Sequence, residues 1–237
     1  MIEVEIPGAR VAFSTRRGGV SEGPYDSLNL GIQTGDAADR VIENRRLLAD
    51  RLGLDVGAIA TGRQVHGTAI ERWGAPPEVS RYGFDDPAAD PPEVDGHTTA
   101  RHGLALLVLV ADCLPVALVS HQRVAMIHCG WRGLADGIVE HALTLFDAAP
   151  AAVVGPGIGR CCFEVGPEVL ARFEDVDGAA DGRMLDLRRV AEARLLAAGV
   201  TGVEHVDLCT SCHPDLFFSH RRDDGVTGRQ CGIVWRP

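Results

Sequence analysis

Apolar runs separated by short polar segments mark the middle of the chain. Three of them follow one another, at residues 104–110, 116–119 and 124–127. Short apolar runs bounded by turn residues are typical of buried strands. Cys113 stands between the first two runs, and His128 follows the third, beside the glycine-rich segment 130–133. A thiol and an imidazole therefore each lie at the end of a predicted strand, where scaffolds often hold functional groups.

Weaker patterns predict the remaining elements. Further strands are expected at residues 2–6, 10–13, 59–65, 151–154, 203–208 and 232–235. Helices are expected at residues 37–53, 134–147, 167–173 and 187–198. Asp36 and Asp186 are suitable N-caps for two of these helices, and Gly53 and Gly199 are suitable stops.

The organisation of the chain favours one domain over residues 1–237. A length of 237 residues allows one large domain or two small ones. The segment at about 74–92 is rich in proline and aspartate and predicts a surface excursion. Apolar strands resume directly after it, without a second core of different character. We therefore expect a single domain with one loop that departs from it.

Composition limits the classes of protein to which the chain can belong. Its net charge of −10 argues against a nucleic-acid partner. The N-terminus lacks the basic start and apolar core of a signal peptide, and the longest apolar run is too short to span a bilayer. Seven cysteines, with Cys161 and Cys162 adjacent, suggest free thiols in a reducing compartment. We expect a soluble, cytoplasmic protein.

Two kinds of chemistry are open to the residues at the strand ends. His66, Cys113 and His128 form a two-histidine, one-cysteine set, which zinc accepts with a fourth position left for catalysis. Alternatively, Cys113 is a nucleophile with His128 or His66 as its base, and amides near residues 130–133 form an oxyanion hole. A single histidine at such a position is more often structural, so both readings require the three residues to converge.

A rival cluster lies near the C-terminus, at Cys209, Cys212 and His213. One Cys-x-x-Cys lacks the second pair that a zinc ribbon needs, and a thioredoxin-like role would place it early in a βαβ unit. We therefore expect this cluster to be mainly structural. The glycine-rich segment 155–166 is a weak dinucleotide signal, because no clear amphipathic helix follows it. A tight turn that brings Cys162 and Glu164 near a pocket is an equal alternative.

Two metalloenzyme classes are disfavoured by missing motifs. A zinc base deaminase should show His-x-Glu and a later Pro-Cys-x-x-Cys, and neither is present. A multicopper oxidase of the cupredoxin type needs many histidines in His-x-His pairs. The chain has nine histidines and no such pair.

A set of short motifs extends nearly from end to end of the chain. They are Phe13-Ser14-Thr15-Arg16, Gly18-Gly19-Val20-Ser21, Asn29-Leu30-Gly31, Gly35-Asp36, Asn44-Arg45, Gln64-Val65-His66-Gly67, Ala111-Asp112-Cys113-Leu114-Pro115, His128-Cys129-Gly130-Trp131-Arg132-Gly133, Gly155-Pro156, Ile158-Gly159, Cys162-Phe163-Glu164-Val165, Asp186-Leu187, Cys209-Thr210 and Phe217-Phe218-Ser219-His220-Arg221. In these motifs the chain resembles the YfiH family, also called the laccase-domain or multicopper polyphenol oxidase family.

The resemblance implies a fold, a metal site and a range of activities. The fold is an α+β layered sandwich of mixed β-sheets with outer α-helices. The metal ligands fall on His66, Cys113 and His128, with zinc as the metal and copper possible. The implied activity is phosphorolysis of adenosine, inosine and methylthioadenosine, with adenosine deamination. Alternatives are a Cys-dependent amidase that edits peptidoglycan precursors, a copper-dependent polyphenol oxidase, and a non-catalytic zinc-stabilised binding protein.

Phosphorolysis suggests roles for several polar residues. The site must hold phosphate, and Arg132 is the first candidate because guanidinium binds oxyanions in bidentate fashion; Arg16 is the second. The candidates for contacts to the ribose or base are Asn44, Gln64 and Asp112. Each of these residues also has an ordinary structural alternative. The sequence leaves open the roles of Cys162, Cys209 and Cys212, the preferred nucleoside, and whether the protein is a monomer or a homodimer.

Overall fold

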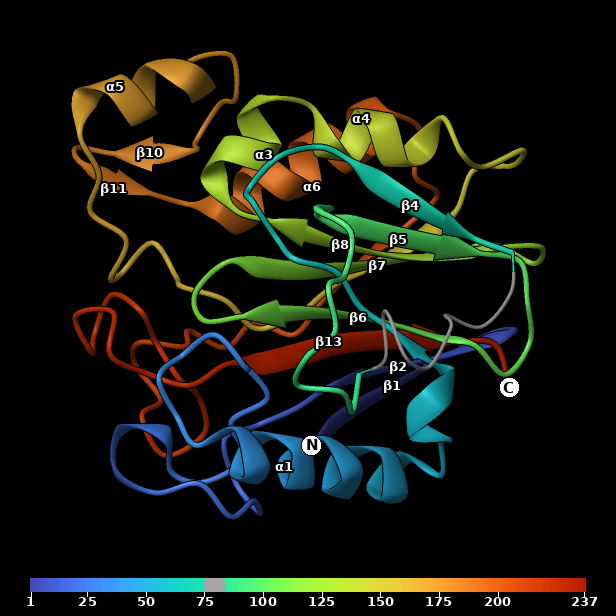
Figure 1. Ribbon diagram of the computed structural model, residues 1–237. Helices are drawn as coiled ribbons and strands as arrows, with labels where there is room; N and C mark the ends of the chain where they lie inside the picture. The colour runs from blue at the N-terminus through green and yellow to red at the C-terminus, as the bar shows by residue number, and fades with distance from the viewer. Residues whose placement is uncertain (75–83) are drawn as a thin grey trace.

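Two β-sheets stack face to face in the middle of the molecule, and helices cover both outer faces (Figure 1). The structure, a computed structural model, describes residues 1–74 and 84–237. Residues 75–83 of the predicted excursion lie outside the described residues. The arrangement confirms the α+β layered sandwich of mixed sheets that the family resemblance implies.

The five-stranded sheet has the strand order β1-β2-β13-β6-β3. Its strands are β1 (Ile2–Ile6), β2 (Ala9–Phe13), β13 (Gln230–Trp235), β6 (Ala105–Val110) and β3 (Ile59–Ala60). All neighbours are antiparallel except β3 and β6. Helix α1 (Ala38–Leu52) packs on its outer face (Figure 1). Short 3₁₀ turns, η1 (Gly23–Tyr25) and η2 (Val56–Ala58), lie before and after α1 in the chain.

The six-stranded sheet has the order β12-β9-β7-β8-β5-β4. Its strands are β12 (Val203–His205), β9 (Ala151–Val154), β7 (Leu114–Val119), β8 (Val124–Cys129), β5 (Gly96–Thr99) and β4 (Ile70–Trp73). The outer face is covered by α3 (Trp131–Ala135), α4 (Ile138–Leu143) and α6 (Leu187–Ala197) (Figure 1). A small lobe beside these helices holds α5 (Pro167–Leu170), η3 (Ala171–Phe173), β10 (Ala180–Asp181) and β11 (Met184–Leu185).

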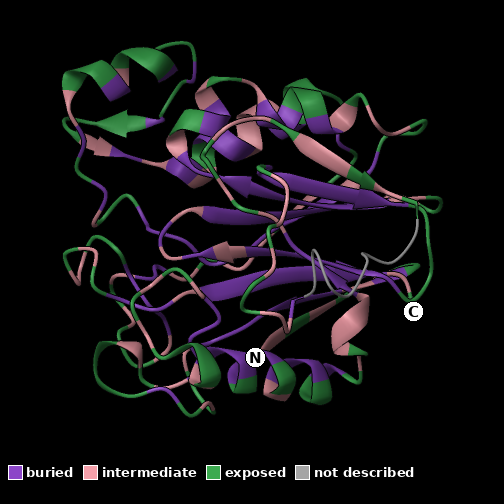
Figure 2. Cartoon of the chain, viewed as in Figure 1, coloured by how far each residue is buried: buried purple, intermediate pink, exposed green. Residues whose placement is uncertain are grey.

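Apolar side chains fill three layers, which explains why the central strands are hydrophobic without alternation. On β6, Leu106 and Val108 face the other sheet, whereas Ala105 and Leu107 pack in the layer that contains α1. Strands buried on both faces read as continuous apolar runs. Figure 2 shows β7, β8 and β13 buried throughout, while α1 buries one side and exposes the other.

Two helix predictions were wrong in part: the continuity of one helix and the N-cap of another. The helix expected at residues 134–147 is broken into α3 and α4, because Gly137 adopts a φ of 92° between them. Asp36 does not cap α1. The N-cap is Ala37, and the Asp36 Oδ2 instead accepts hydrogen bonds from Ser21 and Asn29. The stop at Gly53, with a φ of 66°, is confirmed.

The other predicted cap is confirmed, and two strands are shorter than expected. The Asp186 side chain accepts a hydrogen bond from the Arg189 amide at the start of α6. Of residues 59–65, only Ile59–Ala60 pair as a strand, and the strand expected at 203–208 ends at His205. Within the described residues, no helix is long and apolar enough to cross a membrane.

Candidate metal and substrate site

The hairpin of β7 and β8 brings Cys113 next to His128. Leu114 pairs with Cys129 and Pro115 pairs with His128. Continuing this register by one residue puts Cys113 opposite Gly130. Because side chains alternate between the faces of a sheet, Cys113 and His128 point to the same face. A Cβ at Gly130 would lie 3.0 Å from the Cys113 Sγ and 3.1 Å from the His66 Cδ2. The lack of a side chain at Gly130 therefore lets the thiol and both imidazoles approach one another.

Asp95 joins His128 to the loop that carries His66. The His128 amide donates to the Asp95 carbonyl over 2.7 Å, and the His128 Nδ1 donates to the Asp95 Oδ1 over 2.8 Å. The same carboxylate accepts from the amides of Val65, His66 and Gly67 over 3.1, 3.0 and 2.7 Å. These bonds hold the loop at a place where His66 has a φ of 61°, which is unusual for a residue other than glycine.

His66, Cys113 and His128 converge as a potential metal-ligand set. Their ligand atoms all lie within 4.8 Å of one another, and the two imidazole rings meet edge to face with centroids 4.9 Å apart. His128 is buried, Cys113 is half-buried and His66 is exposed. Since Asp95 binds the Nδ1 of His128, the Nε2 is the nitrogen left for a metal. Two imidazoles and one thiolate, with a carboxylate behind one imidazole, are donors that suit zinc or copper.

Charges within the cluster shift the protonation of its members. Burial would raise the pKa of the Cys113 thiol, but the adjacent His128 and His66 rings lower it to about 6. Burial would lower the pKa of His128, but Cys113 and Asp95 raise it to about 9. At neutral pH the cluster by itself therefore favours a thiolate beside an imidazolium, and the thiolate is the form that binds metals.

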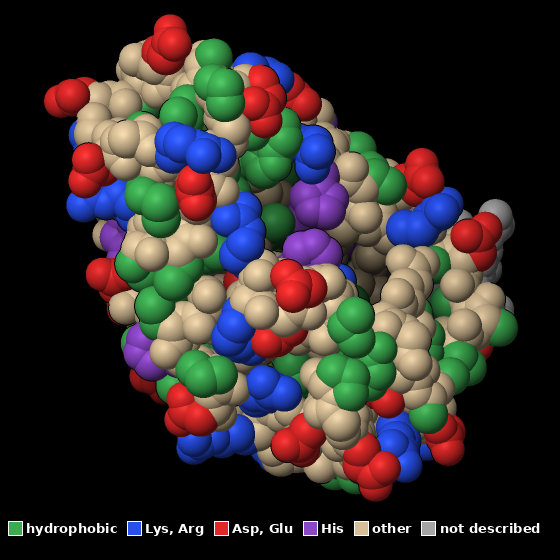
Figure 3. Space-filling view, turned by 90° about the vertical axis from the view of Figure 1, so that its left-hand side faces the viewer, with side chains coloured by type: hydrophobic (Ala, Val, Ile, Leu, Met, Phe, Trp, Pro, Cys, Tyr) green, Lys and Arg blue, Asp and Glu red, His purple; other side chains and the backbone are tan. Residues whose placement is uncertain are grey.

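The cluster opens into a cavity of about 560 Å³ that is lined mainly by the segments connecting the strands of both sheets. This volume suits a small organic molecule. One part of the lining is apolar, with Trp131, Ile158, Phe163 and Leu187. Another part is basic, with Arg63, Arg132, His220, Arg221 and Arg229. Figure 3 looks onto this side of the molecule and shows it hollowed beside histidine and basic side chains.

Three of the sequence-predicted substrate residues line this cavity. Gln64 exchanges two hydrogen bonds with the backbone of Leu109, of 2.7 and 2.8 Å. Asp112 is nearly buried and accepts from the Thr210 hydroxyl over 2.6 Å and the Arg221 amide over 2.7 Å. Arg132 is exposed, with its guanidinium carbon 4.4 Å from the centre of the Trp131 ring.

The other two predicted residues, Arg16 and Asn44, are not part of the cavity lining. Arg16 donates to the carbonyls of Asp26 and Pro214, over 2.6 and 3.0 Å, and stacks over Phe218. Asn44 is fully buried and binds the loop that precedes α1: it accepts from the Val20 amide over 2.8 Å and donates to the carbonyls of that loop. Both residues hold loops together at a distance from the thiol.

Sequence reasoning missed two residues of this region, Asp95 and Arg229. Asp95 follows an apolar residue and directly precedes β5, but nothing local in the sequence indicates that β5 lies beside β8. Arg229 lines the cavity and donates its Nη1 to the carbonyls of Thr227 and Gly228. Burial lowers the pKa of Arg229, while the nearby Cys113 and Asp112 oppose that shift. Its position just before the predicted last strand was the only available signal.

Known proteins match the chain over almost its whole length. Residues 10–237 match the family described as "Multi-copper polyphenol oxidoreductase laccase". "Purine nucleoside phosphorylase YlmD" of Geobacillus stearothermophilus is 36% identical over 251 residues, covering 97% of this chain and 90% of that protein. "Purine nucleoside phosphorylase YfiH" of Escherichia coli (strain K12) is 36% identical over 241 residues, covering 96% and 94%.

Solved structures give the same result at the level of the fold. The hypothetical protein YfiH of Bacillus licheniformis superposes with a TM-score of 0.91 and 32% identity, covering 97% of this chain and 93% of that one. YlmD of Geobacillus stearothermophilus gives a TM-score of 0.89 and 34% identity, covering 97% and 92%. Sequence and fold thus identify the same set of relatives.

Proposed function

Because the chain belongs to the multi-copper polyphenol oxidoreductase laccase family, which includes the YfiH and YlmD proteins, we propose that it is a zinc-dependent purine nucleoside phosphorylase. One observation carries the proposal. The potential metal ligands His66, Cys113 and His128 converge in a cavity whose lining combines an apolar wall with several arginines. That combination suits a purine next to an anion.

His66, Cys113 and His128 would hold the zinc, and a catalytic zinc with three protein ligands would keep a position open for a substrate atom or water. When bound, zinc acts as a Lewis acid that stabilises negative charge developing on the substrate. Asp95 fixes the tautomer and orientation of His128 through its 2.8 Å hydrogen bond, as carboxylates commonly do behind metal-bound histidines. Gly130 provides the space in which the ligands meet.

In phosphorolysis, a phosphate oxygen bonds to the anomeric carbon of ribose while the bond from that carbon to the purine nitrogen breaks. The bonding electrons leave with the purine, which takes up a proton. We assign the phosphate to Arg132 and Arg229, because guanidinium groups bind oxyanions strongly. Trp131 and Phe163 offer flat apolar surfaces for the purine ring.

The remaining sequence-predicted residues receive different assignments. Gln64 and Asp112 line the cavity but use polar atoms within the protein, so we assign them to shaping the walls near the substrate. Arg16 and Asn44 are assigned to supporting the loops between β2 and α1. Adenosine, inosine and methylthioadenosine are the proposed substrates, and adenosine deamination is a proposed additional activity of the same cavity.

Product analysis tests the proposal. Purified protein of measured metal content is incubated with each nucleoside, with and without inorganic phosphate, and the products are separated by chromatography. We expect the free base and the pentose 1-phosphate only when phosphate is present. Cys113→Ala should lose this activity, and Cys231→Ala, which removes a buried thiol in β13, should keep it. Absence of nucleoside turnover by protein with a fully loaded zinc site would overturn the proposal.

A second candidate, a Cys-dependent amidase, is supported by one specific observation. Asp95, His128 and Cys113 stand in the order carboxylate, imidazole and thiol, as in enzymes with a cysteine nucleophile. Such an enzyme would hydrolyse an amide of a cell-wall precursor without phosphate and without metal. Activity that survives removal of zinc by a chelator and requires no phosphate would favour the amidase over the phosphorylase.

A further inference from the structure

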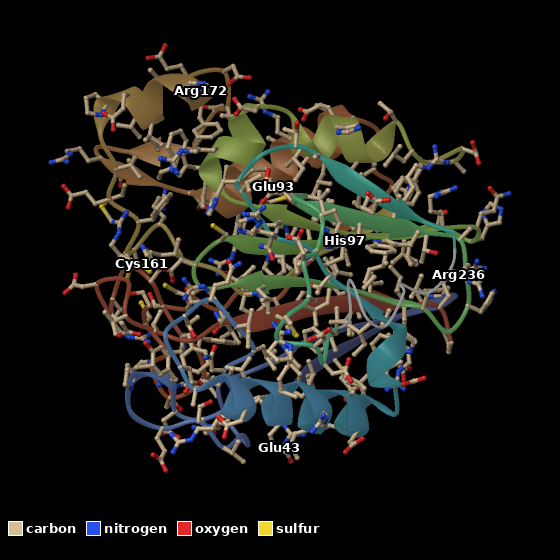
Figure 4. All side chains as sticks on the ribbon, in the orientation of Figure 1. Glu43, Glu93, His97, Cys161, Arg172 and Arg236 are labelled. Carbon is tan, nitrogen blue, oxygen red and sulfur yellow. The ribbon has the colours of Figure 1, made fainter. Side chains whose placement is uncertain are left out.

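A second cluster of metal-ligating side chains lies outside the site described above. Cys161, Cys162, Cys209 and Cys212 have sulfur atoms that all lie within 4.8 Å of one another. The Cys212 Sγ is 3.5 Å from that of Cys161 and 3.4 Å from that of Cys162. Figure 4 shows Cys161 at the edge of the molecule, where the loop after β9 meets the loop after β12.

The sheet brings these two loops together. Strands β9 and β12 are parallel neighbours, with Val154 opposite His205, so the chain leaves both strands at the same edge. The loops stay side by side, because the Thr210 amide donates to the Gly157 carbonyl over 3.0 Å. A turn closed by the Cys162 amide and the Gly159 carbonyl, 3.0 Å apart, then places two adjacent thiols against the Cys-x-x-Cys segment.

We propose that Cys161, Cys162, Cys209 and Cys212 bind one zinc ion at a second, structural site. Four thiolates at about 2.3 Å from a tetrahedral zinc have sulfur atoms roughly 3.8 Å apart. The spacings of 3.4 and 3.5 Å and the limit of 4.8 Å bracket that value. A disulfide, with sulfurs about 2.0 Å apart, accounts for only two of the four thiols. A single Cys-x-x-Cys lacks a second pair for zinc, and the loop after β9 supplies that pair.

The surroundings of Cys209 fit a thiolate that binds a metal. Its sulfur is largely buried and accepts a hydrogen bond from the Gly159 amide over 3.2 Å. An amide that donates to a sulfur stabilises the thiolate, which is the form that binds metals.

With four protein ligands the site is closed, so its role is to join loops and not to bind substrate. The first loop carries Ile158 and Phe163, which form part of the apolar wall of the cavity. The second carries Thr210, whose hydroxyl donates to Asp112 beside Cys113. Zinc at the cysteine cluster thus fixes two segments that shape the proposed purine pocket. The inference depends on the cysteine geometry alone and is independent of the proposed phosphorolysis.

Metal counting tests the proposal. The full chain is purified under reducing conditions, and zinc per chain is measured by mass spectrometry for wild type, Cys113→Ala, Cys212→Ser, Cys161→Ser and the control Cys231→Ser. We expect two zinc ions in wild type and in the control. Cys212→Ser and Cys161→Ser should each lose one zinc, because each removes a thiolate ligand. Both positions are exposed, so the serine does not disturb the buried core. Cys113→Ala should retain the zinc of the cysteine cluster.

Cobalt provides a readout that does not depend on activity. In Cys113→Ala loaded with cobalt, we expect a strong thiolate-to-cobalt charge-transfer band that disappears in Cys113→Ala combined with Cys212→Ser. Equal zinc content in wild type and in both Cys212→Ser and Cys161→Ser would overturn the proposal. So would iron in place of zinc, or an intact mass showing that the four thiols form disulfides under the reducing conditions. Failure of nucleoside turnover would leave these metal counts unchanged.

Discussion

Asp95 directly precedes β5, and continuing the register of β5 with β8 puts it opposite His128, whose Nδ1 donates to the Asp95 carboxylate over 2.8 Å. Three amides of the His66 loop donate to the same carboxylate. One buried anion thus fixes both histidines of the potential metal site, although it does not face the cavity itself. This arrangement makes Asp95 the residue through which the two histidine ligands are coupled.

Replacing Asp95 with asparagine should weaken metal binding more than it disturbs the fold. The amide keeps one acceptor, but its NH₂ group faces donors, so His128 and the His66 loop lose part of their support. We expect the zinc affinity of the site formed by His66, Cys113 and His128 to fall by about 10- to 100-fold, as is typical when a hydrogen-bond partner of a metal ligand is replaced. Competition with a chromophoric chelator measures it. Asp136→Asn, which removes an exposed ion pair with Arg172, is the matched control and should leave the affinity unchanged.

Gly130→Ala should disturb the site by steric contact alone. The backbone of Gly130, with φ −78° and ψ 165°, accepts alanine, but the new methyl group would press on Cys113 and His66. We expect phosphorolysis to fall about tenfold or more, while the free energy of unfolding changes by no more than about 1–3 kcal/mol. Gly202→Ala is the control, because a Cβ there meets nothing within 4 Å. Equal kcat/KM values for the two variants would contradict the assignment of the site.

Phosphate recognition can be divided between two arginines. Arg229→Gln and Arg132→Gln should each raise the KM for phosphate by about tenfold or more, since a charged hydrogen bond contributes about 1.5–3 kcal/mol. The KM for the nucleoside should change less. Arg10→Gln, at an exposed pair with Glu3, serves as the control in initial-rate measurements at varied phosphate. A normal KM for phosphate in both cavity variants would place the anion elsewhere.

Alkaline conditions should destabilise the protein through its buried thiols. Burial raises the pKa of Cys231 to about 11, from an ordinary value of 9.0. Between these values the unfolded chain loses the thiol proton while the folded chain keeps it, so the free energy of unfolding falls as pH rises. The contribution is about 2–3 kcal/mol.

Urea unfolding of wild type and Cys231→Ala at several pH values measures this contribution. The variant is expected to be less stable at pH 8, because it leaves a small cavity. The difference between the two proteins should shrink as the pH approaches 11, because only wild type loses the Cys231 contribution. A difference that stays constant with pH would show that this thiol does not titrate in this way.

How much of the site is predictable depends on how local each contact is. Cys113 and His128 belong to one hairpin with a short turn, so their proximity follows from two adjacent strand predictions. Asp95 reaches His128 only because β5 pairs with β8, and the cysteine pairs meet only because β9 pairs with β12. Neither pairing leaves a local pattern in the chain.

The ends of the helices also could not be predicted fully from the local sequence. Gly53 lies at the end of one predicted helix and Gly137 lies near the start of another, and both adopt positive φ. Gly53 ends a helix as predicted, whereas Gly137 separates α3 from α4 within the segment that was predicted to be one helix. Local sequence indicates where a helix can stop, and tertiary packing decides whether it resumes.

The place of β13 in its sheet sets a condition on how a ribosome can make this protein. The strand lies between β2 and β6 and pairs with both, although it is synthesised more than a hundred residues after either. Until residues 230–235 leave the exit tunnel, the nascent chain carries two strand edges with no partner between them, and such edges recruit other strands. A ribosome that stalls before residue 229 therefore releases an aggregation-prone chain that also lacks Arg229, and not a partly active enzyme.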